Sequence, residues 1–548
     1  SKMKWQPFYL TTVSGIAENH NRRSLSIRDI FSASDSNPIL KICISNYMVD
    51  IHWLINECPI FLTVPTLCMH GSTQPTQISL DNINICRVDM GAERYGTHHS
   101  KFAIIFYQSG VRICITTANF IPEDFEYRTQ GVYLQDFPLK SNTLHTSNPK
   151  CNDFEVSFSE YLNLIHLGKT ARAMLNSMTT NISNYDLSSA EIVLIPSIPG
   201  RHSPQNMNKF GIMKLSLSLK EEYANNNIDA EVDQETLVMQ FSSLGSMGKD
   251  AKLVDEYADY MMPTSSTINK AKKKRIEIVW PTAKCVRESL QGYDAGGSLP
   301  CSAKNILVNG TNNVFLPGFA GRMRVWSGIP SGRERATPHM KCYFAYKQTD
   351  SSGKDGCISS EVEMSWFLLT SSNLSQAAWG VVQHSGRSLY IKSYELGVLF
   401  LPSKVKQHRR LYSNTPSHPL LGVDAVEYVD LSEDIPHSSS STSSSSEMNN
   451  PIVGKANEMV WSKDSTRKRC REDYERSHNA GKSRFVVSQS PITAHPFVVH
   501  FPVPFQIPAQ SYRTDGVSRN GDGEMDVPWV WDKRHPQPDC FGRIFNPT

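Results

Sequence analysis

Thr97-His98-His99-Ser100-Lys101 and, far along the chain, Pro338-His339-Met340-Lys341 decide how this sequence is organised. Each places His-x-Lys at the start of an apolar run, and a second apolar run follows and ends in Asn. The runs are residues 102–107 and 111–119 in the first copy, and 342–346 and 364–373 in the second. Because the same order of features occurs twice, the sequence predicts an internal duplication with one half-site in each copy.

The residue types in this repeated pattern suit phosphoryl transfer. One imidazole can attack phosphorus and form a covalent phosphohistidine, while a second protonates the leaving oxygen and later activates water. Lys101 and Lys341 stand two positions beyond their His, on the same face of an extended strand, and each can hold a phosphate oxygen. Asn119 and Asn373 add amide donors, so such a site stabilises charge without a metal.

A single His-x-Lys would be weak evidence for such a site. The ordinary meaning of so short a match is a surface His and Lys on an edge strand. Two copies, each followed by the same strand, loop, strand and Asn, favour the paired site instead.

Four longer motifs resemble the tyrosyl-DNA phosphodiesterase family of the phospholipase D superfamily: Gly-Thr-His-His-x-Lys at 96–101, Pro-His-x-Lys at 338–341, Thr-Ser-Ser-Asn-Leu-Ser-x-Ala-Ala-Trp-Gly at 370–380 and Ser-Tyr-Glu-Leu-Gly-Val-Leu-Phe at 393–400. The wider superfamily carries an Asp five positions after the Lys, where this chain has Phe106 and Tyr346. The missing Asp indicates the tyrosyl-DNA branch and argues against a lipid hydrolase.

The resemblance implies an α/β fold, with two similar phospholipase D-like α-β-α sandwich domains that have mixed sheets, a pseudo-twofold relation and the active site between them. A chain of 548 residues exceeds one core. A polar run at 184–191 marks the boundary, so we expect domains at 1–188 and 189–548. Along the first domain, residues 46–56 predict a helix and residues 60–67 and 83–88 predict strands.

Composition narrows the class of protein. The net charge of +3 is close to neutral, so any surface that binds nucleic acid has to be local. The twelve cysteines include no Cys-x-x-Cys pair, and Cys86, Cys114 and Cys342 lie in apolar runs, which predicts buried thiols in a reducing compartment. No apolar stretch reaches the roughly 18 residues that span a bilayer, so we expect a soluble protein. The start at Ser1, without Met or a secretory segment, is typical of a trimmed chain.

The resemblance also implies a role for each residue of the paired site. We expect His99 to be the nucleophile and His339 the general acid and base, with Lys101, Lys341, Asn119 and Asn373 holding the phosphoryl oxygens. Glu395 is flanked by apolar residues, and because an unpaired buried carboxylate is costly, an imidazole is its natural partner. In the family Glu395 would serve His99 and Gln130 would serve His339, although Gln130 before Gly131 is equally well explained as a turn residue.

Five further residues are expected to border a substrate groove. Tyr95 is either a core aromatic or a platform for a DNA base, and such stacking contributes about 1–3 kcal/mol per base. Ser243 and Ser246 lie in a Ser- and Gly-rich loop at 240–248, which either forms a turn or contacts phosphates. Pro300 is assigned to the peptide side of the groove. Trp531 is either a packing anchor or a second residue on that side.

Two segments have a composition that differs from a folded core. Residues 438–446 are Ser apart from one Thr, and residues 467–471 are basic around Cys470, so we expect a disordered insertion at about 431–484 with a nuclear signal and phosphorylation sites. The basic run at 270–275 is a solvated strand entry, a surface that follows phosphates or another nuclear signal. We expect the protein in the nucleus, with cytoplasm and mitochondria as further compartments.

The function implied by the resemblance is repair of DNA that carries a topoisomerase I peptide on its 3′ end, single-stranded or at a duplex terminus. Hydrolysis of the 3′-phosphotyrosyl bond through a phosphohistidine would leave a 3′-phosphate, and other 3′ blocking groups would be secondary substrates. The reaction implies no cofactor, metal or membrane, and a monomer suffices because one chain supplies both half-sites. The alternatives are a phospholipase or phosphatidyl transferase, which the missing Asp disfavours, and a silent nucleic-acid-binding protein, which the two intact His-Lys pairs disfavour.

Overall fold

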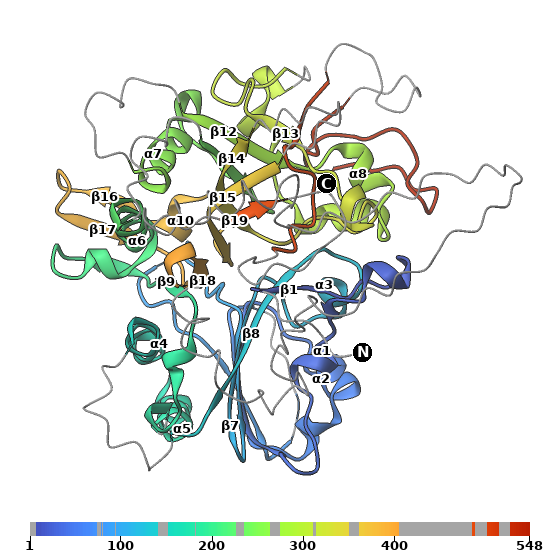
Figure 1. Ribbon diagram of the computed structural model, residues 1–548. Coiled ribbons are helices and arrows are strands. Elements are labelled where there is room, and N and C mark those ends of the chain that lie inside the picture. The colour runs from blue at the N-terminus through green and yellow to red at the C-terminus, as the bar shows by residue number, and fades with distance from the viewer. Residues whose placement is uncertain are drawn as a thin grey trace, which may run out of the picture.

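The apolar runs that follow the two His-x-Lys motifs form neighbouring strands in the middle of two large sheets, one above the other in Figure 1. The structure, a computed structural model, describes residues 7–73, 78, 80–93, 95–140, 152–180, 182–225, 235–263, 274–310, 314–349, 361–404, 485–487, 501–513 and 526–547. The insertion expected at 431–484 and residues 270–273 of the basic run lie outside the described residues.

The first sheet is mixed and has eight strands. In sheet order they are β2 (Ser24–Leu25), β1 (Tyr9–Thr11), β8 (Gly131–Pro138), β7 (Gly110–Thr116), β6 (Phe102–Tyr107), β3 (Ile39–Asn46), β4 (Thr66–His70) and β5 (Ile83–Arg87). Strands β3, β4 and β5 run parallel to one another, whereas β1, β8, β7, β6 and β3 alternate in direction.

Strand β6 explains why helices cover both faces of this sheet. All its residues are buried: Phe102 and Ile104 pack with one helical layer, and Ala103 and Ile105 pack with the other. Side chains alternate across a strand, so an uninterrupted apolar run needs cover on both sides. One layer is α4 (Asp153–Leu164) and α5 (Lys169–Thr179), and the other is α1 (Ile27–Ile30), α2 (Ile51–Glu57) and α3 (Pro122–Glu126) (Figure 1).

The second sheet is also mixed. Its strands, in order, are β20 (Gln510–Ser511), β13 (Met323–Val325), β12 (Arg275–Trp280), β11 (Glu235–Gln240), β14 (Cys342–Thr349), β15 (Glu361–Thr370), β18 (Glu395–Phe400) and β9 (Val193–Ser197), and β19 (Phe485–Val487) also pairs with β15. Its helices are α6 (Gly211–Asn225), α7 (Lys252–Met261), α8 (Ala283–Arg287), α9 (Ala303–Ile306) and α10 (Gln376–Trp379). A small sheet of β10 (Gly200–His202), β17 (Ser388–Ile391) and β16 (Val381–Gln383) lies beside it.

The two large sheets share one strand order and one pattern of directions. Strands β1, β8, β7, β6, β3, β4 and β5 of the first correspond to β9, β18, β15, β14, β11, β12 and β13 of the second. The last three of each series are parallel and the others alternate. This correspondence agrees with the expectation of two similar α/β sandwiches, and it places the two His-x-Lys motifs at equivalent positions before β6 and β14.

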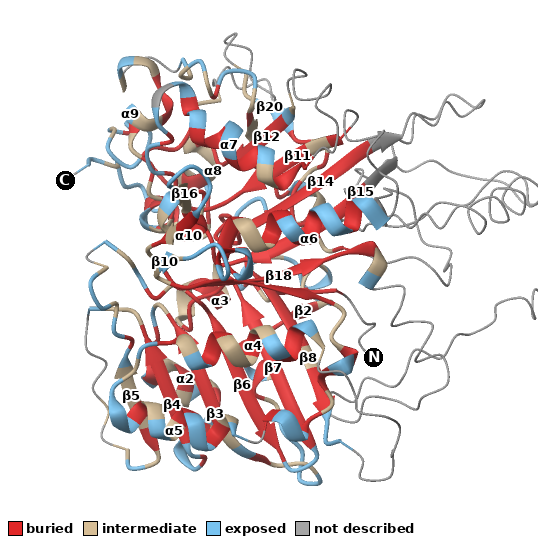
Figure 2. Ribbon diagram, turned by 90° about the vertical axis from the view of Figure 1, so that its left-hand side faces the viewer, coloured by how far each residue is buried: buried red, intermediate tan, exposed pale blue. Residues whose placement is uncertain are grey.

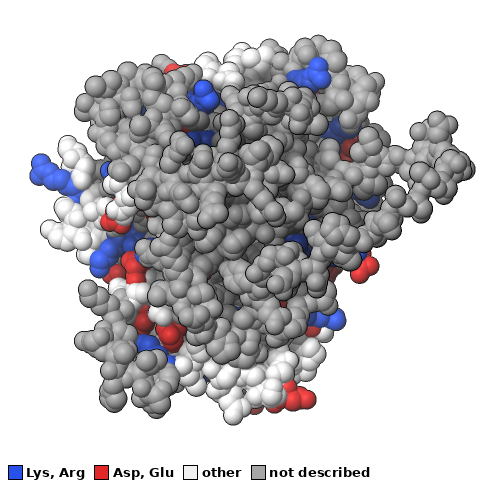
Figure 3. All heavy atoms as spheres, in the orientation of Figure 1, with Lys and Arg blue, Asp and Glu red and all other residues white. Residues whose placement is uncertain are grey.

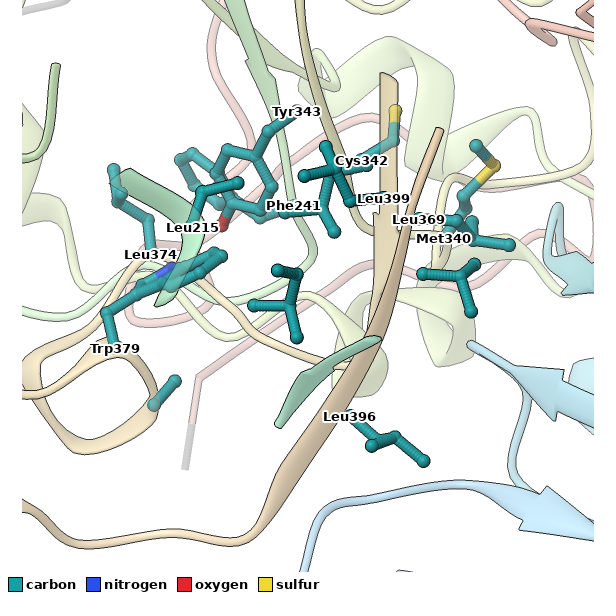
Figure 4. Packing of buried hydrophobic residues seen from close by; sticks show 14 of the residues in the cluster. Leu215, Phe241, Met340, Cys342, Tyr343, Leu369, Leu374, Trp379, Leu396 and Leu399 are labelled. Carbon is teal, nitrogen blue, oxygen red and sulfur yellow. The ribbon is translucent and has the colours of Figure 1, made fainter. Parts of the chain in front are cut away.

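A continuous apolar core joins the two sandwiches, and buried residues run through the strands of both (Figure 2). Phe8 of the first half stacks on Phe367 of the second, with ring centroids 5.0 Å apart. Gly131 packs so closely that a Cβ there would lie 2.6 Å from Cδ1 of Leu369, so the Leu369 side chain would have to shift to admit one. Figure 4 shows the core of the second half, where Tyr343 meets the edge of Trp379.

Two of the expected elements differ from the structure. The helix expected at 46–56 begins only at Ile51, because Asn46 still belongs to β3 and the Asp50 side chain caps the helix by accepting from Trp53 N. The strand expected at 60–67 is wrong over residues 60–65. Pro59–Leu62 form a 3₁₀ helix, which Pro59 initiates in its first turn, and strand β4 starts at Thr66.

On the face drawn in Figure 3, acidic and basic side chains of the described residues lie close together at the left of the view. Within the described ranges, no helix is both long and apolar enough to cross a bilayer.

Candidate active site

Each His-x-Lys motif is held by the opposite half of the molecule. The backbone N–H of His99 donates to the carbonyl of Tyr394 at 2.9 Å, and the N–H of His339 donates to the carbonyl of Thr129 at 3.1 Å. Tyr394 directly precedes β18 and its Glu395, while Thr129 precedes Gln130 and β8. The two half-sites are therefore fixed against each other by matched backbone contacts, as a pseudo-twofold relation requires.

The Glu395 carboxylate orients His99. Oε2 of Glu395 lies 3.0 Å from Nδ1 of His99, and it also accepts from the Ser371 hydroxyl. An Nδ1–H that donates to this carboxylate leaves the lone pair on Nε2 of His99. Burial lowers the pKa of His99, while Glu395 opposes that effect. The geometry therefore presents a neutral, oriented imidazole, which is the form a nucleophile needs.

His339 has two partners at one ring nitrogen. Nε2 of Gln130 lies 2.6 Å from Nδ1 of His339, and Oδ1 of Asp124 lies 3.1 Å from the same atom. Burial lowers the pKa of His339, and the Asp124 carboxylate raises it. The structure thus pairs Glu395 with His99 and Gln130 with His339, and it adds a carboxylate beside His339.

Each lysine is held by the histidine of its own motif, and the two lysines lie close enough to influence each other's charge. Nζ of Lys101 donates to the carbonyl of His99 at 2.7 Å, and Lys341 makes the equivalent bond to His339. Burial lowers the pKa of Lys101 to about 8 and the pKa of Lys341 well below its usual value. The positive charge of Lys101 lowers the pKa of Lys341 further. Two buried like charges of this kind favour binding of an anion such as a phosphodiester.

The two asparagines are held by different partners. Oδ1 of Asn373 accepts from the backbone N–H groups of Ser242 and Ser243, at 3.1 and 3.0 Å, so its amide N–H groups are left for a ligand. Nδ2 of Asn119 donates to Asp124 at 2.9 Å, and its Oδ1 is buried without a partner among the described residues. Asn119 thus lies beside Asp124, which also contacts His339, and Asn373 lies beside the Ser242–Ser243 backbone.

The residues predicted to border a groove fall into two places. Tyr95 is 75% exposed with Nζ of Lys392 5.9 Å from its ring centroid, so the alternative of a core aromatic is wrong. On the other side, Leu244 N donates to the carbonyl of Pro300, and Trp531 N donates to the carbonyl of the next residue, Cys301. The loop after Ser243, the turn at Pro300 and the half-exposed Trp531 thus adjoin one another.

Ser246 makes a local contact. Its hydroxyl accepts from Gly248 N at 3.4 Å, as expected for a turn residue, and its side chain remains exposed.

Two residues at this site were not predicted from the sequence. Asp124 lies in α3 and is fully buried against His339. Tyr47 lies after β3, with its ring centroid 5.7 Å from that of His99 and 6.0 Å from Nζ of Lys101. Neither has a sequence signal: Asp124 follows Pro122 and Glu123 in what reads as the exposed first turn of a helix, and Tyr47 reads as part of a helical face.

The described cysteines are free. Cys114 and Cys342 are buried as expected, whereas Cys86 is only partly buried. No group of three or more His, Cys, Asp or Glu side chains with metal-binding geometry occurs in the described part of the chain.

A sequence profile for tyrosyl-DNA phosphodiesterase matches residues 7–513, which includes both half-sites. The chain belongs to the tyrosyl-DNA phosphodiesterase family. The tyrosyl-DNA phosphodiesterase 1 of Arabidopsis thaliana is 31% identical over 98% of this chain and 76% of its own length. A probable tyrosyl-DNA phosphodiesterase of Caenorhabditis elegans is 28% identical over 71% of this chain and 82% of its own length.

Solved structures agree on the fold. The yeast tyrosyl-DNA phosphodiesterase superposes with a TM-score of 0.52 at 17% identity, over 72% of this chain and 89% of that one. The predicted phospholipase D-like fold with two mixed sheets is therefore confirmed. As a tyrosyl-DNA phosphodiesterase, the protein is a phosphodiester hydrolase of DNA repair.

Proposed function

We propose that this enzyme hydrolyses the 3′-phosphotyrosyl bond between DNA and a topoisomerase I peptide and leaves a DNA 3′-phosphate. The observation that carries the proposal is that both imidazoles are held by their Nδ1 atoms. Glu395 engages His99, and Asp124 and Gln130 engage His339, so Nε2 of each ring is the atom left for substrate. Two rings oriented in this way can share attack and proton transfer at one phosphorus.

In the first step, Nε2 of His99 forms a P–N bond as the P–O bond to tyrosine breaks. His339 passes its Nε2 proton to the departing tyrosyl oxygen. In the second step, water gives a proton to Nε2 of His339 and its oxygen attacks phosphorus, so the P–N bond breaks and His99 is released. Throughout, Lys101 and Lys341 and the amides of the two asparagines offset charge on the phosphoryl oxygens.

The two groups of border residues support a groove with two different occupants. Tyr95 with Lys392 offers an exposed aromatic ring and a cation, the combination that holds single-stranded nucleic acid. The adjoining Ser243 loop, Pro300 and Trp531 offer serine hydroxyls and an apolar ring, which suit a phosphate and a peptide. Because the DNA contacts do not depend on the leaving group, other 3′ blocking groups are secondary substrates.

The basic runs and the strand order support proposals for the cellular compartment, the evolutionary origin and the oligomeric state of the enzyme. The basic runs at 270–275 and 467–471 support a nuclear enzyme. The shared strand order of the two sheets supports an origin by duplication, and one chain that carries both half-sites supports action as a monomer.

The test is cleavage of a 5′-labelled oligonucleotide that carries a 3′-phosphotyrosine, in excess EDTA. The wild type should convert it to the 3′-phosphate form, and His99→Ala should not. His52→Ala, which changes an exposed histidine on α2, is the matched control and should keep the wild-type rate. An unchanged rate in His99→Ala, or conversion that requires magnesium, would contradict the paired-histidine mechanism.

A further inference from the structure

The two half-sites differ at one position that their common topology would make equivalent. Asn119 and Asn373 end the corresponding strand segments, and a short helix follows each, α3 and α10. Five residues after Asn119 stands Asp124, whereas five residues after Asn373 stands Ala378. The first half therefore supplies a buried carboxylate that the second half lacks.

Asp124 is fully buried and reaches His339. Its Oδ1 lies 3.1 Å from Nδ1 of His339. Three other donors hold the carboxylate: the backbone N–H of Asn119 at 2.6 Å, its side-chain amide at 2.9 Å and Nη1 of Arg128 at 2.9 Å. Arg128 in turn donates from Nε to Gln291 at 3.1 Å. A carboxylate held from this many sides is fixed in place and stays ionised.

Gln130 contacts the same ring nitrogen, Nδ1 of His339, but favours its unprotonated form. The Thr117 hydroxyl accepts from Gly131 N at 2.9 Å, so its own proton goes to Oε1 of Gln130 at 2.7 Å. The amide nitrogen of Gln130 therefore faces Nδ1 of His339. An amide N–H favours a lone pair on Nδ1, while the Asp124 carboxylate favours a proton there.

Only the second arrangement lets His339 work as an acid. A neutral ring with its single proton on Nε2 would become an anion if it gave that proton away. A ring that keeps its Nδ1 proton against Asp124 loses the Nε2 proton as a cation, becomes neutral and can then accept a proton from water.

We propose that Asp124 is the positioning residue that makes His339 the proton donor, because its carboxylate keeps a proton on Nδ1 of His339 through both steps. The inference rests on the proposed function. It also accounts for the roles of the two histidines. Nδ1 of His99 faces the Glu395 carboxylate, whereas the equivalent group at His339 is the uncharged amide of Gln130, and Asp124 supplies the negative charge that this amide lacks.

Burial and the Asp124 charge act in opposite directions on the pKa of His339, which burial lowers to about 3. Although burial alone would raise it, His339 and Arg128 hold the pKa of Asp124 far below its usual range. Burial lowers the pKa of His339 and Asp124 opposes that effect, so removal of the charge would lower the pKa of His339 further.

The experiment compares two leaving groups in Asp124→Asn. One oligonucleotide carries a 3′-phosphotyrosine, whose phenol needs a proton to depart, and the other carries a 3′-p-nitrophenyl phosphate, whose phenol departs unprotonated. Since general acid catalysis contributes roughly 10²- to 10⁴-fold, single-turnover cleavage of the tyrosyl substrate should fall on the order of 10²-fold more than cleavage of the nitrophenyl substrate. Glu123→Gln, a partly exposed neighbour on α3, should leave both rates unchanged.

The outcomes separate the two proposals. Cleavage of the nitrophenyl substrate by Asp124→Asn shows that the variant folds, and a selective loss on tyrosine supports the inference. In that case the alkaline limb of kcat/KM for the tyrosyl substrate should also move to lower pH. Equal losses on both substrates would mean that Asp124 only supports the structure, which overturns the inference and leaves the proposed function intact. A wild type that fails to cleave the tyrosyl substrate would overturn the proposed function itself.

Discussion

Cleavage should weaken in alkaline solution because Lys101 loses its charge. Burial lowers the pKa of Lys101 from 10.5 to about 8, and Glu395 and Asp124 offset part of that effect. A neutral amine no longer stabilises the charge on the phosphoryl oxygens. We therefore expect kcat/KM to decline above about pH 8; one pH unit higher, roughly a tenth of the free enzyme would keep the charge.

The assay is kcat/KM for the 3′-phosphotyrosyl oligonucleotide from about pH 6 to pH 10, because this ratio reports ionisations of the free enzyme. Burial lowers the pKa of His339 to about 3, below this range, so the Lys101 ionisation should appear as the break near pH 8. Lys101→Arg should lack that break, whatever its absolute rate, because guanidinium stays charged. Lys304→Arg changes an exposed lysine and should keep the wild-type profile. A break near pH 8 that persists in Lys101→Arg would refute the assignment to Lys101 and point to Lys341, whose pKa is also lowered.

The same pKa shift affects stability with a defined sign. The unfolded chain holds the Lys101 proton up to about pH 10.5, but the folded chain holds it only to about pH 8. Between these values the unfolded state binds more protons, so the contribution of Lys101 to the free energy of unfolding rises with pH. Urea unfolding of the wild type and Lys101→Met across this interval should show a slope in the wild type that the variant reduces.

Three further changes probe other parts of the molecule. His339→Ala should leave enzyme attached to DNA, because the second step loses its base, and a denaturing gel without an adduct would contradict that role. Gly131→Ala should lower the free energy of unfolding by about 1–3 kcal/mol, because the new Cβ would lie 2.6 Å from Cδ1 of Leu369. Gly297→Ala is the control: its Cβ would meet nothing within 4 Å, so the thermal midpoint should stay unchanged. Tyr95→Ala should remove about 1–3 kcal/mol of stacking energy, which would raise KM for single-stranded substrate and leave kcat nearly constant. A change in kcat alone would argue against stacking of a DNA base on Tyr95.

The sequence predicted most reliably where one local pattern determines structure. The runs after His99 and His339 are buried on both faces, so they are apolar throughout and form central strands. The strand expected at 60–67 failed because an apolar run of that length suits a short helix as well as a strand, and Pro59 decided between them.

Residues that act through distant contacts were harder to predict. Asp124 touches His339 across 215 positions of sequence, and nothing in its neighbourhood separates it from an exposed acid at a helix start. The pairing of Glu395 and Gln130 with the two histidines came from family resemblance alone, because the spacing along the chain carries no information about which half each would face.

In a site built from two similar halves, the two histidines would have similar protonation states unless their surroundings differ. Identical surroundings would give both histidines one pKa, yet the reaction needs an unprotonated ring and a protonated ring at the same pH. The motifs themselves cannot supply that difference, since both read His-x-Lys with a later Asn. It has to arise among the groups that contact the rings, and the halves differ there: Glu395 corresponds to Gln130, and Asp124 corresponds to Ala378. In the proposed mechanism, differences between the two copies at these positions, rather than their shared residues, would therefore determine which histidine attacks and which gives the proton.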